Sequence, residues 1–455
     1  MGQFSRAIRS YFMRATLKQL FNWRIHLLAL VLVCLAELIG IARFDIGIGT
    51  VLLLPLLYAF VFSVFFNPNI VPPLGRFIGK EGNKISTQWI LIFLMPFIAK
   101  FAVGIGPNIN EIIAAGPSLI LQELGNVGTV FFALPVAVLL FGMGRESIGA
   151  AHSIAREPNI ALIADRYGLK TPEGIGVMGV YVMGTLFGAV YFSIVPSLIA
   201  SWDVFDIRAL AMACGVGSGS MMGACSASLS ELLPEHKDEI IAFAASSNLL
   251  TYGTGLFLSI FVALPLAEWM YKVCSKLRGR KEANKSSSVE TSSKVVVKEE
   301  DLAGLDDVEE TKLTLGQTLI GVSFSAITIL IVNWVGTGVN PLTALPGMII
   351  LLICCYLGIL IKQVLPINIP SIAWISIVAI FAALPFMPMD SYVIEATNQL
   401  GLLSMISPAL AYAGFAISQS EVKLFKRSGI KIAIIAILVF TGSYIGSVII
   451  ADALL

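Results

Sequence analysis

The stretch Cys214–Ser228 reads CGVGSGSMMGACSAS, and twelve of its fifteen residues are Gly, Ala, Ser or Cys. It interrupts a chain that otherwise consists of long apolar runs. Glycine weakens a helix and exposes its backbone N–H and C=O groups. Hydrocarbon cannot satisfy such groups, so an interrupted backbone is tolerated in a membrane only where it is buried in protein or lines a watery cavity. In transporters, interruptions of this kind mark the place where substrate and ions bind.

The composition is that of an integral membrane protein. Of the 455 residues, 57% are hydrophobic and only 13% are charged, whereas a soluble domain carries about 25% charged residues. The net charge of +1 gives no indication of nucleic-acid binding. Residues 1–24 contain five basic residues and no acidic one, which predicts a retained, cytoplasmic, basic amphipathic segment rather than a cleaved signal peptide. The six cysteines show neither metal-ligand spacing nor a CxxC pair, so we interpret them as small hydrophobic residues.

Apolar runs long enough to cross a bilayer, about 17–25 residues each, occur on both sides of a hydrophilic segment. They lie near 25–43, 46–66, 88–106, 127–142, 174–198, 241–266, 315–335, 343–361, 367–387, 398–417 and 430–450. The segment between them is rich in Ser, Lys and Glu and cannot support a core. We therefore predict an all-α polytopic membrane protein with about 11–13 transmembrane segments. Its predicted parts are a basic segment over 1–24, a transmembrane half over 25–271, a disordered cytoplasmic linker over 272–312 and a second transmembrane half over 313–455.

The distribution of basic residues predicts the topology. Lysines and arginines in 272–285 place the start of the linker in the cytoplasm, and those in 423–431 place the turn before the last span there too. The C-terminus is then extracytoplasmic. With cytoplasmic ends on both sides of the first half, the number of crossings must be even. The six apolar spans of this half already give an even number. The number stays even only if 144–171 and 209–228 both cross, or if both enter and leave on one side. The two segments are therefore predicted to be a pair of discontinuous helices.

The first of these interrupted segments, 144–171, concentrates polar residues beside Gly144. Its candidate substrate-binding residues are Arg145, Ser147, Gly149 and His152. A helix N-terminus there favours an anion, Arg can add a forked pair of hydrogen bonds, and His can serve proton coupling near neutral pH. The alternative is a cytoplasmic loop whose Arg and Glu side chains form solvated ion pairs.

The second interrupted segment, 209–228, combines bare backbone with hydroxyl groups that suit a carboxylate or a partly dehydrated Na⁺. Polar residues of the following span complete the candidate cavity. The candidate substrate-binding residues are Gly217, Ser218, Gly219, Ser220, Asn248 and Thr251. The alternative is a close helix–helix contact through Gly219-x-x-x-Gly223. Lys100, toward the end of its span, is expected to reach the membrane surface or to pair with Glu111.

The sequence lacks the common motifs of hydrolases, nucleotide-binding proteins and zinc proteases. The chain has no HExxH, GxSxG or GxxxxGK[ST] motif and no GxGxxG in a strand–helix context. Ser147 and His152 are more than one helical turn apart, which argues against a catalytic dyad. We therefore expect neither an enzyme nor a cofactor or metal centre, and transport energy must come from a Na⁺ or H⁺ gradient or from the solute's own gradient.

Parts of the chain resemble a known pair of families. Residues 144–192, with Thr171-Pro172-Glu173-Gly174-Ile175-Gly176, and the run that begins at Arg208 resemble the LrgB/CidB family. Leu345-Pro346-Gly347 and Ile406-Ser407-Pro408 similarly look like the partner LrgA/CidA family. The whole chain looks most like an uncharacterised family of bacterial inner-membrane proteins. The resemblance implies a two-part transporter with discontinuous helices, whose plant relative exports glycolate and glycerate from plastids.

The resemblance departs from the family at the expected substrate positions. Gly149-Ala150 stands where the family has a threonine pair, Arg145 is closest to a family lysine, and the family's histidine before the glycine motif is missing. The predicted function is therefore secondary transport of a small organic anion, a carboxylate other than the family's own, across the bacterial inner membrane by an elevator-like or rocking motion. A homodimer is expected by analogy with elevator scaffolds. The rival hypothesis is a channel or holin-like regulator of cell-wall turnover.

Overall fold

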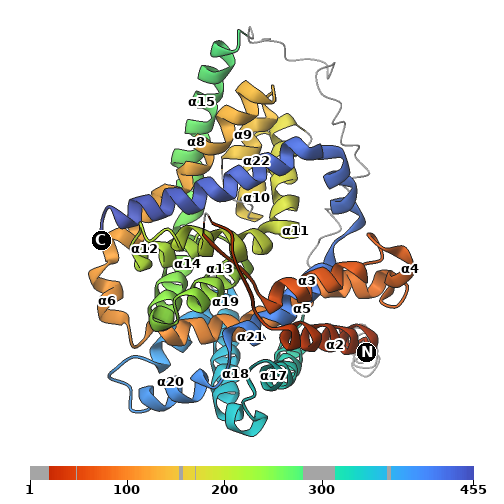
Figure 1. The fold of residues 1–455 in the computed structure, drawn as a ribbon, viewed down its shortest axis with the longest axis vertical. Helices are drawn as coiled ribbons and strands as arrows, with labels where there is room; N and C mark the ends of the chain where they lie inside the picture. Colours follow the sequence, from red (N-terminus) through yellow and green to blue (C-terminus); the bar gives the residue numbers. More distant parts are fainter. Residues whose placement is uncertain (1–19, 48, 153–156, 170, 280–312, 366–369) are drawn as a thin grey trace, which may run out of the picture.

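The computed structural model describes residues 20–279 and 313–455, apart from 48, 153–156, 170 and 366–369. Most of the predicted basic segment and of the predicted linker lie outside these residues. The described part contains seven helices that are long and apolar enough to cross a membrane, or eight if one bent pair counts as a single span. They are Gly79–Ile105, Gly116–Leu140, Pro172–Ala200, Thr254–Leu277, Leu315–Thr337, Pro341–Val364 and Gly429–Asp452. The protein is thus an all-α polytopic membrane protein, as predicted (Figure 1).

The N-terminal half contains most of the short and interrupted elements. Its helices are α2 (Trp23–Ile39), α3 (Pro55–Phe65), α4 (Pro72–Gly75), α5 (Gly79–Ile105), α6 (Ile109–Ala114), α7 (Gly116–Leu121), η1 (Gln122–Val127), α8 (Gly128–Pro135), η2 (Val136–Leu140), α9 (Glu146–Ala151), α10 (Glu157–Arg166), α11 (Pro172–Ala200), α12 (Ile207–Cys214), α13 (Gly219–Leu232), η3 (Pro234–His236), α14 (Lys237–Leu258), η4 (Ser259–Ala263) and α15 (Leu264–Leu277). Because α15 continues to Leu277, the first residues assigned to the linker belong to this helix.

The C-terminal half is simpler. Its helices are α17 (Leu315–Thr337), α18 (Pro341–Val364), α19 (Ser371–Ala382), α20 (Asp390–Asn398), α21 (Leu402–Ala416) and α22 (Gln419–Asp452). Gly429 has φ 69° inside α22 and bends that helix, so only the part beyond it is long, straight and apolar enough to span.

One predicted span is only partly helical. The apolar run 46–66 begins in the turn of a short β-hairpin, in which β1 (Ala42–Asp45) pairs antiparallel with β2 (Thr50–Leu53), before α3 begins at Pro55. Gly47 and Gly49 in the turn have φ of +76° and +149°, which side-chain-bearing residues rarely adopt. The run is long enough to cross as a helix, but its two glycines and Pro55 divide it.

The last helix runs beside two helices of the N-terminal half. A Cβ on Gly125 would lie 2.2 Å from the backbone nitrogen of Ser447. At the other end, Lys431 Nζ donates to Phe141 O over 3.1 Å, so Gly116–Leu140 and α22 are antiparallel. The Tyr191 and Thr441 hydroxyls, 2.6 Å apart, join α11 to α22. Since Asp452, at the end of α22, receives the backbone N–H of Asp206 just after α11, these two helices are parallel.

The two halves of the sequence therefore interleave. Besides α22, α21 packs against α3 and α5, and Asn67 donates to the carbonyls of Gly414 and Phe415 over 3.0 and 2.9 Å. Figure 1 shows α21 and α22 among the helices of the N-terminal half, with α17 and α18 at one side. The two halves of the chain, before and after the linker, therefore do not form two separate packed bodies.

Candidate functional site

The second interrupted segment forms a helical hairpin of α12 and α13, which we call the α12–α13 hairpin. The helix α12 runs beside α14 in the same direction, because Arg208 lies 4.0 Å from Glu239 while Gly215 O accepts from Asn248 2.8 Å away. The chain then turns at Gly215–Ser218 and α13 returns toward the start of α14. The segment thus enters and leaves at the same end, which decides between the two alternatives that the sequence left open.

The backbone at the turn of this hairpin is satisfied by one buried side chain. Asn248, only 4% exposed, donates through Nδ2 to Gly215 O at 2.8 Å and to Gly217 O at 2.9 Å. Ser218 caps α13 by accepting from the N–H of Met221 at 3.4 Å. These bonds meet the requirement that exposed peptide groups inside a membrane protein find partners within the protein. The side chain of Asn248 therefore stabilises the non-helical turn between α12 and α13.

A disulfide crosses the turn. Cys214, the last residue of α12, is bonded to Cys225 in α13, with their Cα atoms 5.4 Å apart. The interpretation of all six cysteines as small hydrophobic residues is wrong for this pair. Eleven positions separate the two in sequence, and only the reversal of the chain at the glycines brings them together.

A pocket lies beside the N-terminus of α13. Its polar lining comes from Asn248, Tyr252 and Ser376, and α5 contributes apolar side chains that include Ile98 and Phe101. A Cβ on Gly219, the first residue of α13, would lie 3.4 Å from Ile98 and 4.0 Å from the Tyr252 hydroxyl, so the first turn of α13 adjoins this pocket. The backbone N–H groups of a helix N-terminus favour negative charge.

The hydroxyls of the turn are also placed for polar contact. Ser218 and Ser220 are half-buried, and their hydroxyl oxygens are 3.1 Å apart. Gly217 approaches α13 closely, because a Cβ there would lie 2.7 Å from Met221 Cβ. The structure therefore groups five predicted residues, Gly217 to Ser220 and Asn248, around one turn, and of these Asn248 also lines the pocket.

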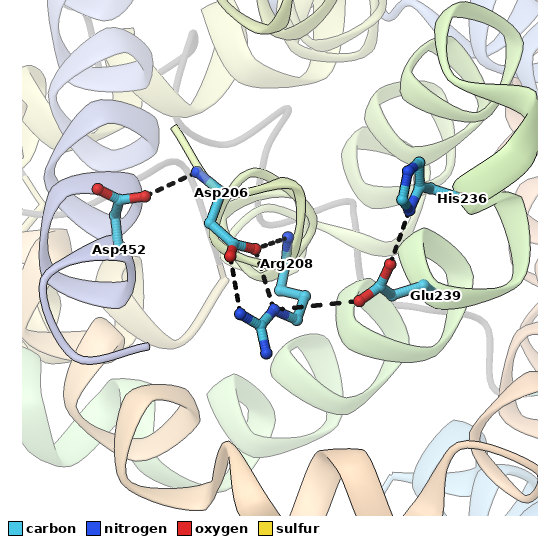
Figure 2. A network of polar contacts seen from close by, with 5 residues as sticks. All are labelled: Asp206, Arg208, His236, Glu239 and Asp452. Carbon is cyan, nitrogen blue, oxygen red and sulfur yellow. Dashed lines mark hydrogen bonds and ion pairs between the residues drawn. The ribbon is translucent and has the colours of Figure 1, made fainter. Parts of the chain in front are cut away.

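A polar network closes the open end of the hairpin (Figure 2). Asp206 caps α12 and accepts from Arg208 Nε at 3.0 Å and Nη2 at 2.7 Å. These bonds hold the pKa of the Asp206 carboxyl below its ordinary value. Glu239 at the start of α14 joins Arg208 to His236, and Asp452 receives the backbone N–H of Asp206. The network ties the starts of α12 and α14 to the end of α22.

The first interrupted segment has a different character. Arg145, expected to receive an anion or to pair with its neighbour Glu146, instead pairs with Glu173 at the start of α11. Ser147 is fully buried and donates to Gly144 O at 2.7 Å. Gly149 faces the Glu173 carbonyl so closely that a Cβ would lie 1.8 Å from it. With six residues, α9 is a short helix whose polar groups serve internal packing.

His152 ends α9 in a buried environment. Its Nδ1 lies 3.0 Å from Gly149 O, and its Nε2 has no hydrogen-bond partner within the described part of the chain. The side chain is fully enclosed. It is not among the residues that line the pocket beside α13.

The two interrupted segments do not meet. The first segment follows Phe141, which contacts Lys431 near the start of α22. The second segment begins at Asp206, which contacts Asp452 at the end of α22. Both contact α11, the first at Gly176 and the second at Gly188, twelve positions or about 18 Å apart along the helix. The two segments therefore pack against different parts of α11 and do not cross, because the short α9 stays at the beginning of that helix.

Sequence reasoning missed a buried polar cluster in η1. Glu123 is 4% exposed and accepts from Gln122 Nε2 at 3.0 Å, from Asn126 Nδ2 at 3.1 Å and from the hydroxyl of Thr251. We call these four residues the carboxyl cluster. The predicted span began at residue 127, which left Gln122–Asn126 in a loop. The glycines of GNVG, which allow close packing on α22, were the signal that could have extended it.

A third interruption lies in the C-terminal half. The helices α20 and α21 meet at an angle of 61°, and Asn333 bonds both Gln399 O and the Gly401 N–H at this bend. Lys100, 6% exposed, donates to Asn398 Oδ1 at 2.6 Å. The prediction that it snorkels or pairs with Glu111 is wrong, because its position in α5 faces this bend.

The fold and the hairpin define the class of protein: a multi-pass helical membrane protein with interrupted helices. The chain belongs to the family described as "Protein of unknown function (DUF3100)", which matches residues 34–273. No curated protein and no solved structure matches the chain. The matched range includes both interrupted segments and the carboxyl cluster, and it ends near the predicted start of the linker. The likeness to the LrgB/CidB and LrgA/CidA families stays a prediction from the quoted motifs.

Proposed function

We propose that the protein is a secondary active transporter that carries a small organic anion, a carboxylate, across the bacterial inner membrane. The observation that supports this best is the α12–α13 hairpin, an interrupted helix pair whose turn adjoins a pocket inside a helical membrane protein. Interrupted backbone at such a position is costly, and in membrane proteins it accompanies substrate or ion binding.

The chemistry of the turn favours an anion with a short apolar body. The fourteen-residue helix α13 directs the positive end of its dipole toward the turn. The Ser218 and Ser220 hydroxyls and the Tyr252 side chain can hydrogen bond a carboxylate, whereas Ile98 and Phe101 suit a small hydrocarbon portion. Thr251 belongs to the carboxyl cluster, so in this proposal it acts in coupling rather than in direct substrate contact.

Orientation follows from the charge distribution. With the basic turn before α22 in the cytoplasm and the C-terminus outside, the α12–α13 hairpin would enter from the extracytoplasmic side and the first interrupted segment from the cytoplasmic side. In an elevator or rocking cycle, the hairpin and α14 would move against α5 and α19, which form the other wall of the pocket. Coupling to H⁺ or Na⁺ and assembly as a homodimer belong to the same proposal.

The decisive experiment replaces Gly219 with leucine. Gly219→Leu would extend into the space between Ile98 and Tyr252, so we expect saturable carboxylate uptake into proteoliposomes to fall about tenfold or more, which is about 1.4 kcal/mol. The matched control is Gly316→Leu in α17, where nothing lies within 4 Å of an added Cβ. Equal uptake by both variants would refute the assignment of the pocket.

The substrate itself can be found by thermal stabilisation. Purified protein is heated with individual mono- and dicarboxylates, with and without Na⁺ and at several pH values. A ligand at about 100 times its Kd stabilises the folded state by about 2.7 kcal/mol, and Gly219→Leu should abolish that shift. If no carboxylate stabilises the protein and any flux fails to saturate, the transporter proposal is wrong and a channel is favoured.

A further inference from the structure

The carboxyl cluster places an acid in the interior of a membrane-spanning segment. Glu123 lies in Gly116–Leu140, and its hydrogen-bond partners include Gln122, Asn126 and Thr251, which are neutral side chains from η1 and α14. A carboxylate in such a position is costly unless it is paired or neutralised. The protonation state of this group is therefore the first question that the geometry raises.

The hydroxyl of Thr251 has more acceptors within reach than it has hydrogens to donate. The Thr251 hydroxyl contacts both Ser247 O, at 2.8 Å, and Glu123 Oε1, yet a hydroxyl carries a single hydrogen. A threonine within a helix regularly donates to the carbonyl four positions earlier. If Thr251 donates to Ser247 O, the close contact with Glu123 is a hydrogen bond only when the carboxyl itself carries the hydrogen.

Gln122 supplies an independent observation. Its side chain is fully buried, and Nε2 donates to Glu123 Oε1 at 3.0 Å and to Ser247 Oγ at 2.9 Å. The carbonyl oxygen of the same amide, Oε1, has no hydrogen-bond partner among the residues that the structure describes. An unmet buried acceptor costs about 1–3 kcal/mol. Beside Glu123 there is thus a buried oxygen suited to receive a proton-bearing species.

The cluster is connected directly to the turn of the α12–α13 hairpin. Ser247, which accepts from Gln122, packs so tightly on Gly215 that a Cβ there would lie 2.5 Å from the serine Oγ. Asn248, the next residue, holds the Gly215 and Gly217 carbonyls. A change of charge or hydrogen bonding at Glu123 reaches the turn through two adjacent residues of α14.

Other titratable groups on the elements around η1 are more remote. No Asp, Glu, Lys, Arg or His occurs in α7, α8 or η4. The titratable residues of α14 and α22 with described side chains are Lys237, Asp238, Glu239, Tyr252, Glu421, Lys423, Lys426, Lys431, Tyr444 and Asp452. Lys237–Glu239 precede Thr251 by at least twelve positions, about 18 Å along α14. The nearest in sequence to the cluster contacts, Tyr252 and Tyr444, carry phenols that are ordinarily neutral near pH 7.

We propose that Glu123 is a proton-binding site, protonated in this conformation, and that its proton is released and rebound as the α12–α13 hairpin moves. The step is a simple acid dissociation in which the O–H bond of the carboxyl breaks and water accepts the proton. This inference rests on the proposed function for its link to transport. It identifies H⁺ as the coupling ion and assigns the role to Glu123 rather than to His152.

The direct test is difference infrared spectroscopy of the purified protein without substrate, recorded as the pH is raised. The carbonyl-stretch band of a protonated carboxylic acid should be present in the wild type and decline with pH. Glu123→Gln, which resembles the protonated acid in shape, should fold normally and lose this band. Both proteins are compared in a Glu37→Gln background, because Glu37 is a second buried carboxyl group, which accepts a hydrogen bond from Ser407 and would add a band of its own. Retention of the titrating band in Glu123→Gln would overturn the proposal.

Two further measurements separate this proposal from the proposed function. Thr251→Val removes the hydroxyl but preserves the shape of the side chain, so the Glu123 band should move to higher frequency; an unchanged band would refute the hydrogen-bond assignment. In proteoliposomes, Glu123→Gln should lose the dependence of uptake on a pH gradient. If the band is lost but no carboxylate is carried, the substrate proposal fails and the proton site stands. If uptake is saturable and its pH dependence survives in Glu123→Gln, the proton site fails and the transporter stands.

Discussion

Replacement of Asn248 by alanine provides the sharpest test of how the interrupted backbone is stabilised. The substitution removes two hydrogen bonds, to Gly215 O at 2.8 Å and to Gly217 O at 2.9 Å. Both carbonyls belong to buried residues, and each buried acceptor left unmet costs about 1–3 kcal/mol. We therefore expect Asn248→Ala to destabilise the region of the turn by about 2–6 kcal/mol, the sum of two such terms.

The assay has two parts, because unfolding of a large membrane protein is not a simple two-state process. Hydrogen exchange followed by mass spectrometry should show faster exchange in peptides that cover 215–222, and the thermal unfolding midpoint in detergent should fall. Asn108→Ala is the matched control. Asn108 is only half-buried and donates a single hydrogen bond to Gly104 O at 3.0 Å, so its loss should cost about 0.5–1.5 kcal/mol.

The comparison has a clear refuting result. If Asn248→Ala and Asn108→Ala shift the midpoint equally and exchange at 215–222 is unchanged, then the side chain of Asn248 does not stabilise the turn. Asn248→Asp refines the test, because a carboxylate supplies no donor and adds repulsion toward two carbonyl oxygens. It should destabilise the turn at least as much as alanine does.

Three other predictions concern groups outside the turn. Asp206→Ala should lower stability by about 0.5–2 kcal/mol through loss of the α12 cap, whereas Asp206→Asn should keep the cap. The pKa of Asp206 is lowered in the folded state, so its charge stabilises the fold at pH values above the unfolded pKa, about 3.9. This contribution disappears as the pH falls through the folded pKa. In a plot of unfolding midpoint against pH, Asp206→Asn should therefore weaken the decrease on the acid side. Lys100→Met should leave thermal stability unchanged or raise it, while Asn398→Leu, which leaves the buried ammonium without this acceptor, should lower it by about 1–3 kcal/mol. Cys214→Ser should lower the unfolding midpoint by an amount equivalent to about 2–3 kcal/mol, and Cys225 should resist alkylation in the wild type until the protein is reduced.

The long apolar helices could be predicted from the sequence because hydrophobic length alone identifies them. The predicted spans near 88–106, 315–335 and 343–361 correspond to α5, α17 and α18. The run at 46–66 was mispredicted because mean hydropathy does not show where the chain reverses its direction. The positive φ of Gly47 and Gly49 follows from local conformation, which an average over a window conceals.

The position of the interrupted backbone could be predicted from the sequence, but the partners of its polar side chains could not. Composition identified the glycine turn, and parity of crossings required 144–171 and 209–228 to behave alike. The partners of each polar group depended on tertiary contacts that sequence spacing does not contain. Arg145 bonds Glu173, twenty-eight positions away, and Lys100 bonds Asn398 from the other half of the chain. Glu123 was missed because the start of its helix was placed at residue 127, eleven residues after Gly116.

The position of α22 has a consequence for how the protein is made. Among the described elements it is the last to leave the ribosome, yet Ser443 and Ser447 complete hydrogen bonds to Asn126 and Gln122. Before α22 is made, the earlier helices therefore lack the partner that packs on Gly125 and Gly128. The packing of Gln122–Asn126 is therefore completed only after α22 has been made.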